Sequence, residues 1–308
     1  MGLSSSIPIL VIFFNRPDSL GRVLRALQKV RPKRLFFAVD GPRVGNNKDA
    51  VAIKECIDTV QQIVHWTKEI QFLQSEVNLG CDEWIPQAIS WFFLHVQSGI
   101  ILEDDCLVDE GFFQFAGEML TRYEDISRVM NISAANFNKQ AWGEGDYYFS
   151  RYPANWGWAT WKRAWASYEH DVSKFSADFL SMQRLSVLLK DQRQAKFWIR
   201  FASKLRDGSA TFWDAKWFLS ILRNDGVSIT PNFNLVSNIG YGDGATHTHL
   251  KTPDMEMEIV TAKLDGFAPP ALLEPNSRAD IELFDMRYKP TILGRLLAMH
   301  GRLVRLIR

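Results

Sequence analysis

The stretch Ile7-Pro-Ile-Leu-Val-Ile-Phe-Phe-Asn-Arg-Pro-Asp18 decides the fold class of this chain. Residues 7–14 form a continuous apolar run, which is typical of a strand that is covered on both faces. The run ends at Asn15 and Arg16. Pro17 then suits the first turn of a helix, where a missing N–H group costs no hydrogen bond. The chain therefore opens with a buried strand that leads directly into a helix.

The same alternation continues to about residue 132. Strands are expected at residues 35–39, 70–73, 99–102 and 128–132, and helices at residues 52–64, 84–96 and 112–123. Strands that alternate with helices predict an α/β fold, in which crossover helices cover the sheet. Ligands of such sheets bind at the carboxyl ends of the strands, so the polar residues at those ends are the first candidates for a site.

Beyond residue 132 the pattern changes, although no linker or internal repeat separates a second unit. A hairpin is expected at residues 143–149, an aromatic loop at 155–161, helices at 175–205 and from 212 onward, and short strands at 227–229 and 235–238. We expect one domain with a C-terminal elaboration rather than two domains.

Charge and composition narrow the function classes. The 308 residues include 36 Lys and Arg against 35 Asp and Glu, so no global positive field would hold a nucleic acid. The three cysteines (Cys56, Cys81 and Cys106) are too few for a disulfide framework and suit a reducing compartment. No secretory signal and no membrane-spanning stretch is recognisable in the sequence, so we expect a cytoplasmic protein.

Residues 290–308 combine apolar side chains near helical spacing with Arg295, Arg302, Arg305 and Arg308. Two interpretations fit this basic amphipathic pattern equally. The segment is either a helix that lies on the inner face of an anionic membrane, as a peripheral contact, or a C-terminal helix that docks on the domain with its arginines in solvent.

Glu103-Asp104-Asp105 is the most informative motif. Three consecutive carboxylates repel one another, so their position after a buried strand calls for a cation or several hydrogen-bond donors. Mg²⁺ and Mn²⁺ suit such oxygen ligands and are usually held by one or two carboxylates plus substrate phosphates. The alternative is an acidic loop before the next helix, where negative charge is favourable. His247 and His249, in a polar loop, either share a metal or are simply exposed.

Two other strand ends carry candidates for nucleotide contacts. Asn15 and Arg16 lie beside a helix start, where a diphosphate could bind; the alternative is that Asn15 caps the helix and Arg16 is solvated. Asp40 could accept a hydrogen bond from a base or a sugar, or could be an ordinary turn aspartate before Gly41. The chain lacks the glycine-rich fingerprints of a dinucleotide fold or a P-loop, so neither NAD nor an ATP-hydrolysing motor is indicated.

Aromatic residues in the second half are also candidates. Asp214 follows Trp213 at an expected helix start, and an aspartate shielded by an indole can act as a general base, because desolvation raises its pKa. The alternative is a capping aspartate beside a core tryptophan. Trp156, Trp158 and Trp161 could stack on a sugar ring or fill the core.

Taken in order, these motifs resemble the GT-A glycosyltransferases, in particular those like N-acetylglucosaminyltransferase I. The resemblance spans roughly residues 7–240. It rests on Pro8-Ile-Leu-Val-Ile-Phe-Phe-Asn-Arg16, Phe36-Phe-Ala-Val-Asp40, Glu103-Asp-Asp-Cys-Leu-Val-Asp-Glu-Gly-Phe-Phe113, Asn155-Trp-Gly-Trp158 and Phe212-Trp-Asp214. It implies a Rossmann-like nucleotide-diphospho-sugar transferase fold, with a mixed central sheet flanked by helices.

The resemblance implies a metal-dependent inverting glycosyltransferase that moves a hexosyl or N-acetylhexosaminyl group. The donor would be a nucleotide-diphosphate sugar, UDP-linked, and the acceptor a glycan or glycolipid, as in polysaccharide biosynthesis. Residues 1–250 would form the GT-A domain, with a nucleotide-binding part at about 7–132 and an acceptor part at about 133–250. Residues 251–308 would be an extension that carries the basic helix. Without a recognisable anchor, the chain looks like a bacterial relative.

The resemblance also implies roles on the donor side. Asp40 would pair with uracil, and Asn15 and Arg16 would lie near the nucleotide. Asp104 would approach the ribose, and Glu103 the transferred sugar.

The resemblance likewise implies a metal ligand and a catalytic base. Asp105 would ligate Mn²⁺, or Mg²⁺, that bridges the diphosphate, and His247 is a further candidate ligand. Trp158 and Trp213 join the donor-binding set, and Asp214 would deprotonate the acceptor hydroxyl. Two alternatives to this function are a sugar-phosphate nucleotidyltransferase, whose glycine-rich opening loop is not matched here, and a catalytically silent nucleotide-sugar-binding or glycan-binding module.

Overall fold

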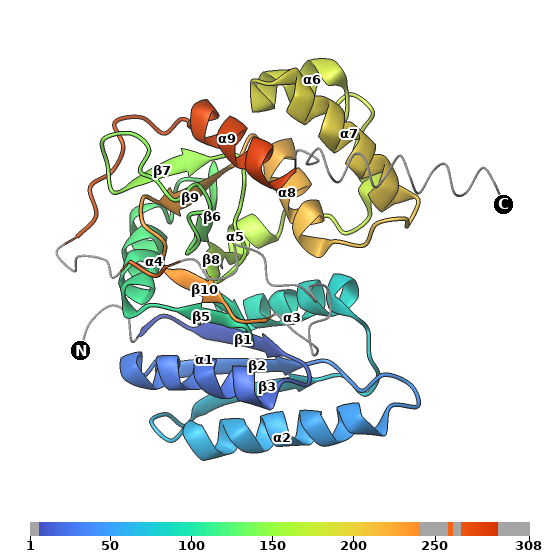
Figure 1. Ribbon diagram of the computed structural model, residues 1–308, viewed down its shortest axis with the longest axis vertical. Helices are drawn as coiled ribbons and strands as arrows, with labels where there is room; N and C mark the ends of the chain where they lie inside the picture. Colours follow the sequence, from blue (N-terminus) through green and yellow to red (C-terminus); the bar gives the residue numbers. More distant parts are fainter. Residues whose placement is uncertain (1–5, 241–257, 261–265, 289–308) are drawn as a thin grey trace.

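The structure, a computed structural model, describes residues 6–240, 258–260 and 266–288 (Figure 1). Its helices are α1 (Pro17–Val30), α2 (Asn47–Ile63), α3 (Cys81–His95), α4 (Glu110–Arg122), α5 (Lys162–Trp165), the 3₁₀-helix η2 (Val172–Lys174), α6 (Met182–Leu189), α7 (Gln192–Arg206), α8 (Trp213–Arg223) and α9 (Ser277–Arg287). Its strands are β1 (Ile9–Phe13), β2 (Arg34–Val39), β3 (Glu69–Gln74), β4 (Ser98–Glu103), β5 (Cys106–Val108), β6 (Val129–Ser133), β7 (Tyr147–Ser150), β8 (Trp158–Trp161), β9 (Val227–Pro231) and β10 (Val236–Asn238).

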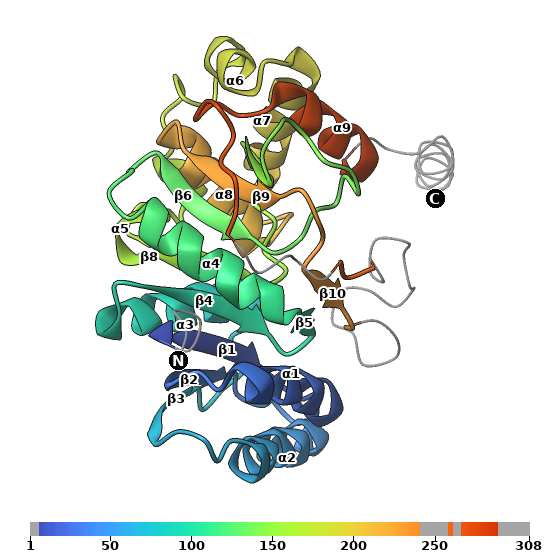
Figure 2. The same ribbon diagram turned by 90° about the vertical axis from the view of Figure 1, so that its left-hand side faces the viewer.

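One mixed sheet of eight strands runs through the molecule in the order β3-β2-β1-β4-β8-β6-β9-β7. Strands β1 to β4 are parallel, β8 is antiparallel to both β4 and β6, and β7 is antiparallel to β9. Figures 1 and 2 show α1 and α2 beside the β1–β3 end, and α6, α7 and α9 at the opposite end. The predicted α/β class, with a mixed central sheet flanked by helices, is confirmed.

The alternation of side chains along β1 explains why both faces of the sheet carry helices. Ile9, Val11 and Phe13 belong to one hydrophobic cluster, with residues of α1, α2 and α4, and Leu10 and Ile12 belong to another, with residues of α3, α5 and α8. None of the five side chains is more than 4% exposed. A strand buried on both faces must be apolar at every position, and this is the pattern that residues 7–14 show.

Two expectations for the second half are wrong, and both involve long-range pairing. No hairpin forms at residues 143–149: β7 pairs with β9, which lies far along the chain. Residues 155–161 are not only an aromatic loop, because Trp158–Trp161 is strand β8, hydrogen-bonded between β4 and β6. Strand β5, which follows the acidic run and pairs with β10, was not expected either.

The C-terminal segment packs on the body of the molecule through α9. The buried carboxylate of Asp280 accepts hydrogen bonds from the Ser150 hydroxyl at 2.5 Å and from the backbone N–H of Arg151 at 3.0 Å. The side-chain amide of Asn138 also donates to the carbonyl of Ala279 at 3.2 Å. The basic helix expected at residues 290–308 lies outside the described residues. Within the described part of the chain, none of the helices has the length and apolar character needed to cross a bilayer.

Candidate functional site

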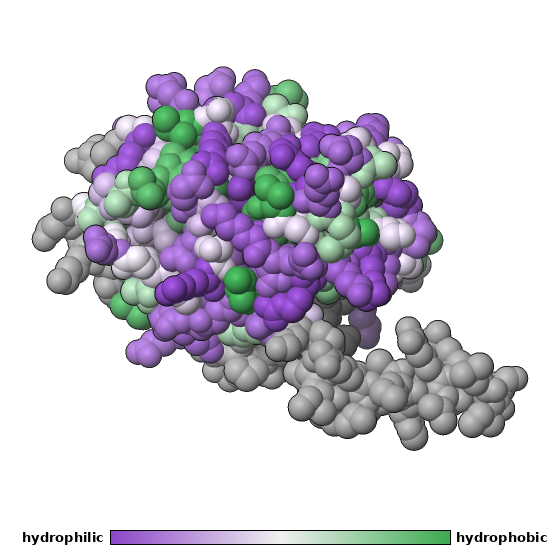
Figure 3. Space-filling view, turned by 90° about the horizontal axis from the view of Figure 1, so that it is seen from above, coloured by the Kyte–Doolittle hydropathy of each residue, from purple (hydrophilic) through white to green (hydrophobic). Residues whose placement is uncertain are grey.

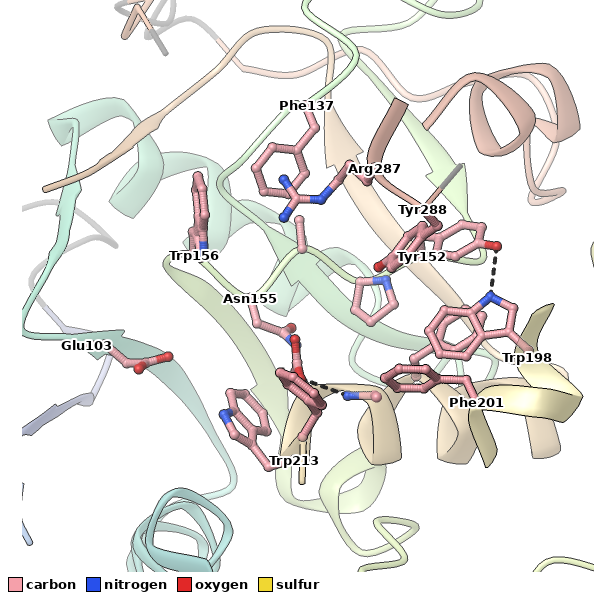
Figure 4. Close-up of a pocket in the computed structure, with 16 residues that line it drawn as sticks. Glu103, Phe137, Tyr152, Asn155, Trp156, Trp198, Phe201, Trp213, Arg287 and Tyr288 are labelled. Atoms are coloured by element: carbon pink, nitrogen blue, oxygen red, sulfur yellow. Dashed lines mark hydrogen bonds between the residues drawn. The ribbon is translucent and has the colours of Figure 1, made fainter. Parts of the chain in front are cut away.

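A cavity of about 350 Å³ lies between the carboxyl end of β4 and the helices α7, α8 and α9 (Figure 4). Its lining is mostly aromatic. The rings come from Phe137, Tyr152, Trp156, Trp198, Phe201, Phe212, Trp213, Phe218 and Tyr288. The charged side chains of the lining are Glu103, Asp214 and Arg287. A few charged groups set in apolar, aromatic walls are the usual composition of a small-molecule site.

Glu103, the last residue of β4, and Asp214, in the first turn of α8, line this same cavity. Burial, followed by the negative charges of Asp105 and Asp104, raises the pKa of Glu103 to about 8. Burial also raises the pKa of Asp214, whose carboxylate accepts a hydrogen bond from the N–H of Ala215 at 2.9 Å. A carboxylate with a raised pKa, open to a cavity, is suited to accept a proton from a bound hydroxyl.

Arg16 lies against the other two carboxylates of the acidic run. Its guanidinium pairs with Asp104, a side chain that is only 2% exposed, and its Nη1 lies 3.0 Å from Oδ2 of Asp105. The backbone N–H of Phe14 also donates to Oδ2 of Asp104 at 3.4 Å. The end of β1 thus supplies a cation for the carboxylates at the end of β4.

Asp40 is buried and holds the loop that leads into α3. Its Oδ1 accepts hydrogen bonds from the N–H of Gly41 at 2.8 Å and of Leu79 at 2.9 Å. Its Oδ2 accepts from the N–H of Gly80 at 2.9 Å and from Nδ2 of Asn78 at 3.0 Å. Of the two roles considered for Asp40, this geometry is that of the turn aspartate, since both oxygens are already engaged.

Asn15 also contacts the protein scaffold. Its Nδ2 donates to Oδ1 of Asp49 at 2.9 Å, and Arg43 donates to the other oxygen of Asp49 at 2.7 Å. These hydrogen bonds, that of Arg43 first, lower the pKa of Asp49 to about 2. Asn15 does not cap α1, because the N-cap position is Arg16 and no side chain caps this helix.

The tryptophans divide between the cavity and the core. Trp156 and Trp213 line the cavity. Trp158 is 1% exposed in β8, and its ring centroid lies 6.0 Å from that of Trp213. Trp161 is also buried, and its Nε1 donates to the carbonyl of Leu120 at 3.1 Å. Trp158 therefore supports Trp213 from within the core. Its assignment to the donor-binding set needs correction, because strand pairing leaves its ring almost no exposed surface.

Arg287 and Tyr288, at the end of α9, line the cavity although they lie in the segment assigned to an extension. The Arg287 guanidinium lies 4.0 Å from the ring centroid of Phe137 and 5.5 Å from that of Trp156, as Figure 4 illustrates. Such cation–π contacts stabilise a planar cation on a ring face. No local motif marks these two residues, since α9 reaches the cavity only through tertiary packing.

Asp105 is the residue of the acidic run best suited to a divalent ion. Its side chain is 15% exposed, and its Oδ1 lies 3.3 Å from the donor Nδ2 of Asn238. A Cβ added at Gly240 would collide with Oδ2 of Asp105 and with Nη1 of Arg16, so glycine is required for the close packing of this segment against the ion pair. One carboxylate, with phosphate oxygens and water at the remaining positions, is an ordinary ligand set for Mg²⁺ or Mn²⁺. Asp105 would hold such an ion through an oxygen that Arg16 or Asn238 contacts in this structure. His247 and His249 lie outside the described residues.

A second group with metal-ligand spacing lies near the start of α3. Ligand atoms of Asp82, Glu83 and His170 lie within 4.8 Å of one another. However, the buried ammonium of Lys216 lies 2.6 Å from Oδ2 of Asp82 and 3.4 Å from Nε2 of His170. Because Lys216 already supplies positive charge there, we interpret this group as an ion-pair network.

No protein-family model matches the chain, and a search of the curated proteins finds no significantly similar sequence. Its function is therefore inferred from the residues of the cavity and from the sequence motifs that surround it.

Proposed function

We propose that this protein is a metal-dependent, inverting glycosyltransferase of the GT-A type. Its donor is a nucleotide-diphosphate sugar, UDP-linked by resemblance, and its acceptor is a hydroxyl group of a glycan or glycolipid. The observation that carries the proposal is the cavity shared by Glu103 and Asp214. One carboxylate belongs to the acidic run and the other stands at the start of α8, and the aromatic walls around them suit the faces of a sugar ring.

On the donor side, the nucleotide diphosphate would lie along the carboxyl ends of β1, β2 and β4, the usual ligand edge of an open α/β sheet. Arg16, which is 22% exposed, would contact phosphate oxygens while it holds Asp104. Asp105 would hold the divalent ion. When bound, this ion would neutralise the charge that develops on the leaving diphosphate.

On the acceptor side, Asp214 would take the proton of the acceptor hydroxyl as the oxygen attacks the anomeric carbon. The new glycosidic bond forms while the bond to the diphosphate oxygen breaks, and its electron pair leaves with the diphosphate. Because attack comes from the opposite face, the configuration inverts. The raised pKa of Asp214 favours this proton transfer. Fixing both reactants in one cavity supplies a large part of the rate.

The deciding experiment incubates the protein with a panel of UDP-, GDP- and dTDP-linked sugars and measures nucleoside diphosphate release, with and without acceptor sugars. We expect release from one donor class with Mn²⁺, suppressed by EDTA. A binding module would bind the nucleotide without releasing it, and a nucleotidyltransferase would instead exchange pyrophosphate. Either result, or the absence of release from every donor, would contradict the proposal.

A further inference from the structure

Helix α7 carries a concentration of positive charge. Its 15 residues include Arg193, Lys196, Arg200, Lys204 and Arg206 and no acidic residue. The whole chain, by contrast, is nearly balanced, with 36 basic and 35 acidic residues. A basic helix on a neutral protein creates a local positive field, which attracts anions to that part of the surface.

In the part of the chain that the structure describes, Arg200 and Lys204 form no ion pair, although the charge of Lys204 helps to lower the pKa of nearby Asp207. Both side chains are exposed. Arg193, by contrast, pairs with Asp191 at 2.7 Å and with Asp285 at 3.0 Å. The positive charge that remains available for a ligand on this helix therefore includes Arg200 and Lys204.

These two cations stand beside an aromatic path to the reaction cavity. Phe197, Arg200, Phe201 and Lys204, spaced at three or four residues, line one hollow along α7. Phe201 also lines the cavity that contains Asp214, so the hollow and the cavity share a wall. The rings of Phe197 and Phe201 are nearly parallel, at 10°, with centroids 5.7 Å apart. A molecule that extends out of the cavity along α7 would thus meet ring faces and then positive charge.

The surrounding surface argues for a small anionic group rather than a broad apolar partner. Figure 3 views the molecule from above Figure 1, the side that carries α6 and α7, and shows a mostly hydrophilic face with separate small hydrophobic patches. Interfaces and inserting membrane surfaces present larger continuous apolar areas. Two adjacent cations beside stacked rings are suited to bind a molecule whose anionic group contacts the cations and whose uncharged or apolar part contacts the rings.

We propose that the acceptor carries an anionic group, a phosphate ester or a carboxylate, which binds Arg200 and Lys204. Its neighbouring portion lies on Phe197 and Phe201, and its reactive hydroxyl lies beside Asp214. This inference rests on the proposed function for the reacting hydroxyl. The anion site itself belongs to α7 and can be tested without turnover.

The activity test compares two acceptors that differ only in charge: an alkyl glycoside, and the same sugar joined to the same alkyl chain through a phosphodiester. We expect the wild-type protein to prefer the anionic acceptor, and the variant Arg200→Glu/Lys204→Glu to lose roughly tenfold in kcat/KM for it, from two exposed ion pairs. Transfer to the neutral acceptor and acceptor-free donor hydrolysis should stay unchanged.

The control is Arg22→Glu/Arg25→Glu on α1, which changes the net charge equally on two exposed residues away from the cavity. Equal use of both acceptors by the wild type, or an equal loss in the control, would overturn the anion site. A binding experiment that needs no turnover distinguishes failure of the anion site from failure of the proposed function. Decyl phosphate should bind the wild type more tightly than decyl glucoside, measured by calorimetry, and only Arg200→Glu/Lys204→Glu should lose the difference. Equal binding of the two amphiphiles would overturn the inference whatever the outcome of the donor assay.

Discussion

Glu103, Asp104 and Asp105 are neighbours in the chain, but each meets a different environment. Glu103 faces the cavity, Asp104 is buried against Arg16, and Asp105 stands at the edge beside Asn238. Successive side chains at the end of a strand point in different directions, so one short run can serve three purposes. Burial, followed by repulsion from Asp105 and Asp104, raises the pKa of Glu103 to about 8, while Arg16 pairs with the other two carboxylates of the run.

The role of Asp214 can be tested by a single-atom change. Asp214→Asn keeps the size of the side chain and an oxygen that can accept from the N–H of Ala215. An amide is not a base and cannot take the proton from the hydroxyl group of the acceptor sugar. We therefore expect kcat to fall by roughly 10²- to 10⁴-fold while the affinity for nucleotide changes little. Kinetics and calorimetry measure the two quantities separately. Turnover near the wild-type rate would assign the base to another residue.

The role of Asp105 is best tested through metal-dependent binding rather than through rate. In the wild-type protein we expect Mn²⁺ to increase the affinity for UDP, because Asp105 would hold an ion whose positive charge attracts the diphosphate. Asp105→Asn should abolish this increase and leave the weaker metal-free binding. Glu110→Gln is the control, since it removes a nearby exposed negative charge. If Mn²⁺ still strengthens UDP binding in Asp105→Asn, the ion is held elsewhere.

At the scale of helices and strands, the sequence predicted most elements of the first half and also α6, α7, α8, β9 and β10 of the second, but not β5, β8 or the partner of β7. Continuous apolar runs such as residues 7–14 predict buried strands, because a strand buried on both faces is apolar at every position. Trp158 and Trp161 gave no such signal. Their segment is a strand only because β4 and β6 lie on either side of it, and those contacts are remote in sequence.

The residues of the candidate site also differ in whether the sequence alone could identify them. Glu103 and Asp214 could be selected from local motifs, since strand ends and helix starts are visible in the sequence. Arg287 and Tyr288 could not be, because α9 reaches the cavity from another part of the fold. The hydrogen bonds that engage Asp40 also come from a loop far along the chain, so its scaffold role could not be separated from a ligand role beforehand.

The docking of α9 should make stability depend on pH through Asp280. Burial raises the pKa of this carboxyl from 3.8 to about 6. Between these values the folded protein holds a proton that the unfolded chain has lost, so the free energy of unfolding falls as pH rises from about 4 to about 6. A pKa shift of this size limits the fall in the free energy of unfolding to about 3 kcal/mol. We expect the variant Asp280→Asn, whose side chain is neutral at every pH, to lack this fall. Urea denaturation at several pH values measures it.

Glu282→Gln, which changes an exposed carboxylate on the same helix, is the control for that experiment. It should retain the wild-type dependence on pH. If Asp280→Asn and the wild type lose stability in parallel over this range, the carboxyl group titrates at an ordinary pKa and another group governs the pH dependence.

At the scale of the whole molecule, the cavity joins parts of the chain that one sheet connects. β4 contributes Glu103, while α8 and α9 contribute Asp214 and Arg287. The eight strands, from β3 at one edge of the sheet to β7 at the other, form a continuous hydrogen-bonded layer. A ligand in the cavity therefore contacts both halves of the molecule, and its binding energy opposes unfolding of the whole sheet.

We accordingly expect one cooperative thermal transition, with a Tm that rises when UDP and Mn²⁺ are both present. A ligand that binds only the folded form at 100 times its Kd adds about 2.7 kcal/mol to the free energy of unfolding. For a chain of this size that amounts to several degrees. The rise should be smaller with UDP and EDTA, and Asp105→Ala should remove the difference. Equal rises with and without metal would contradict the role of the ion, and two separate transitions would show that the sheet does not unfold as one unit.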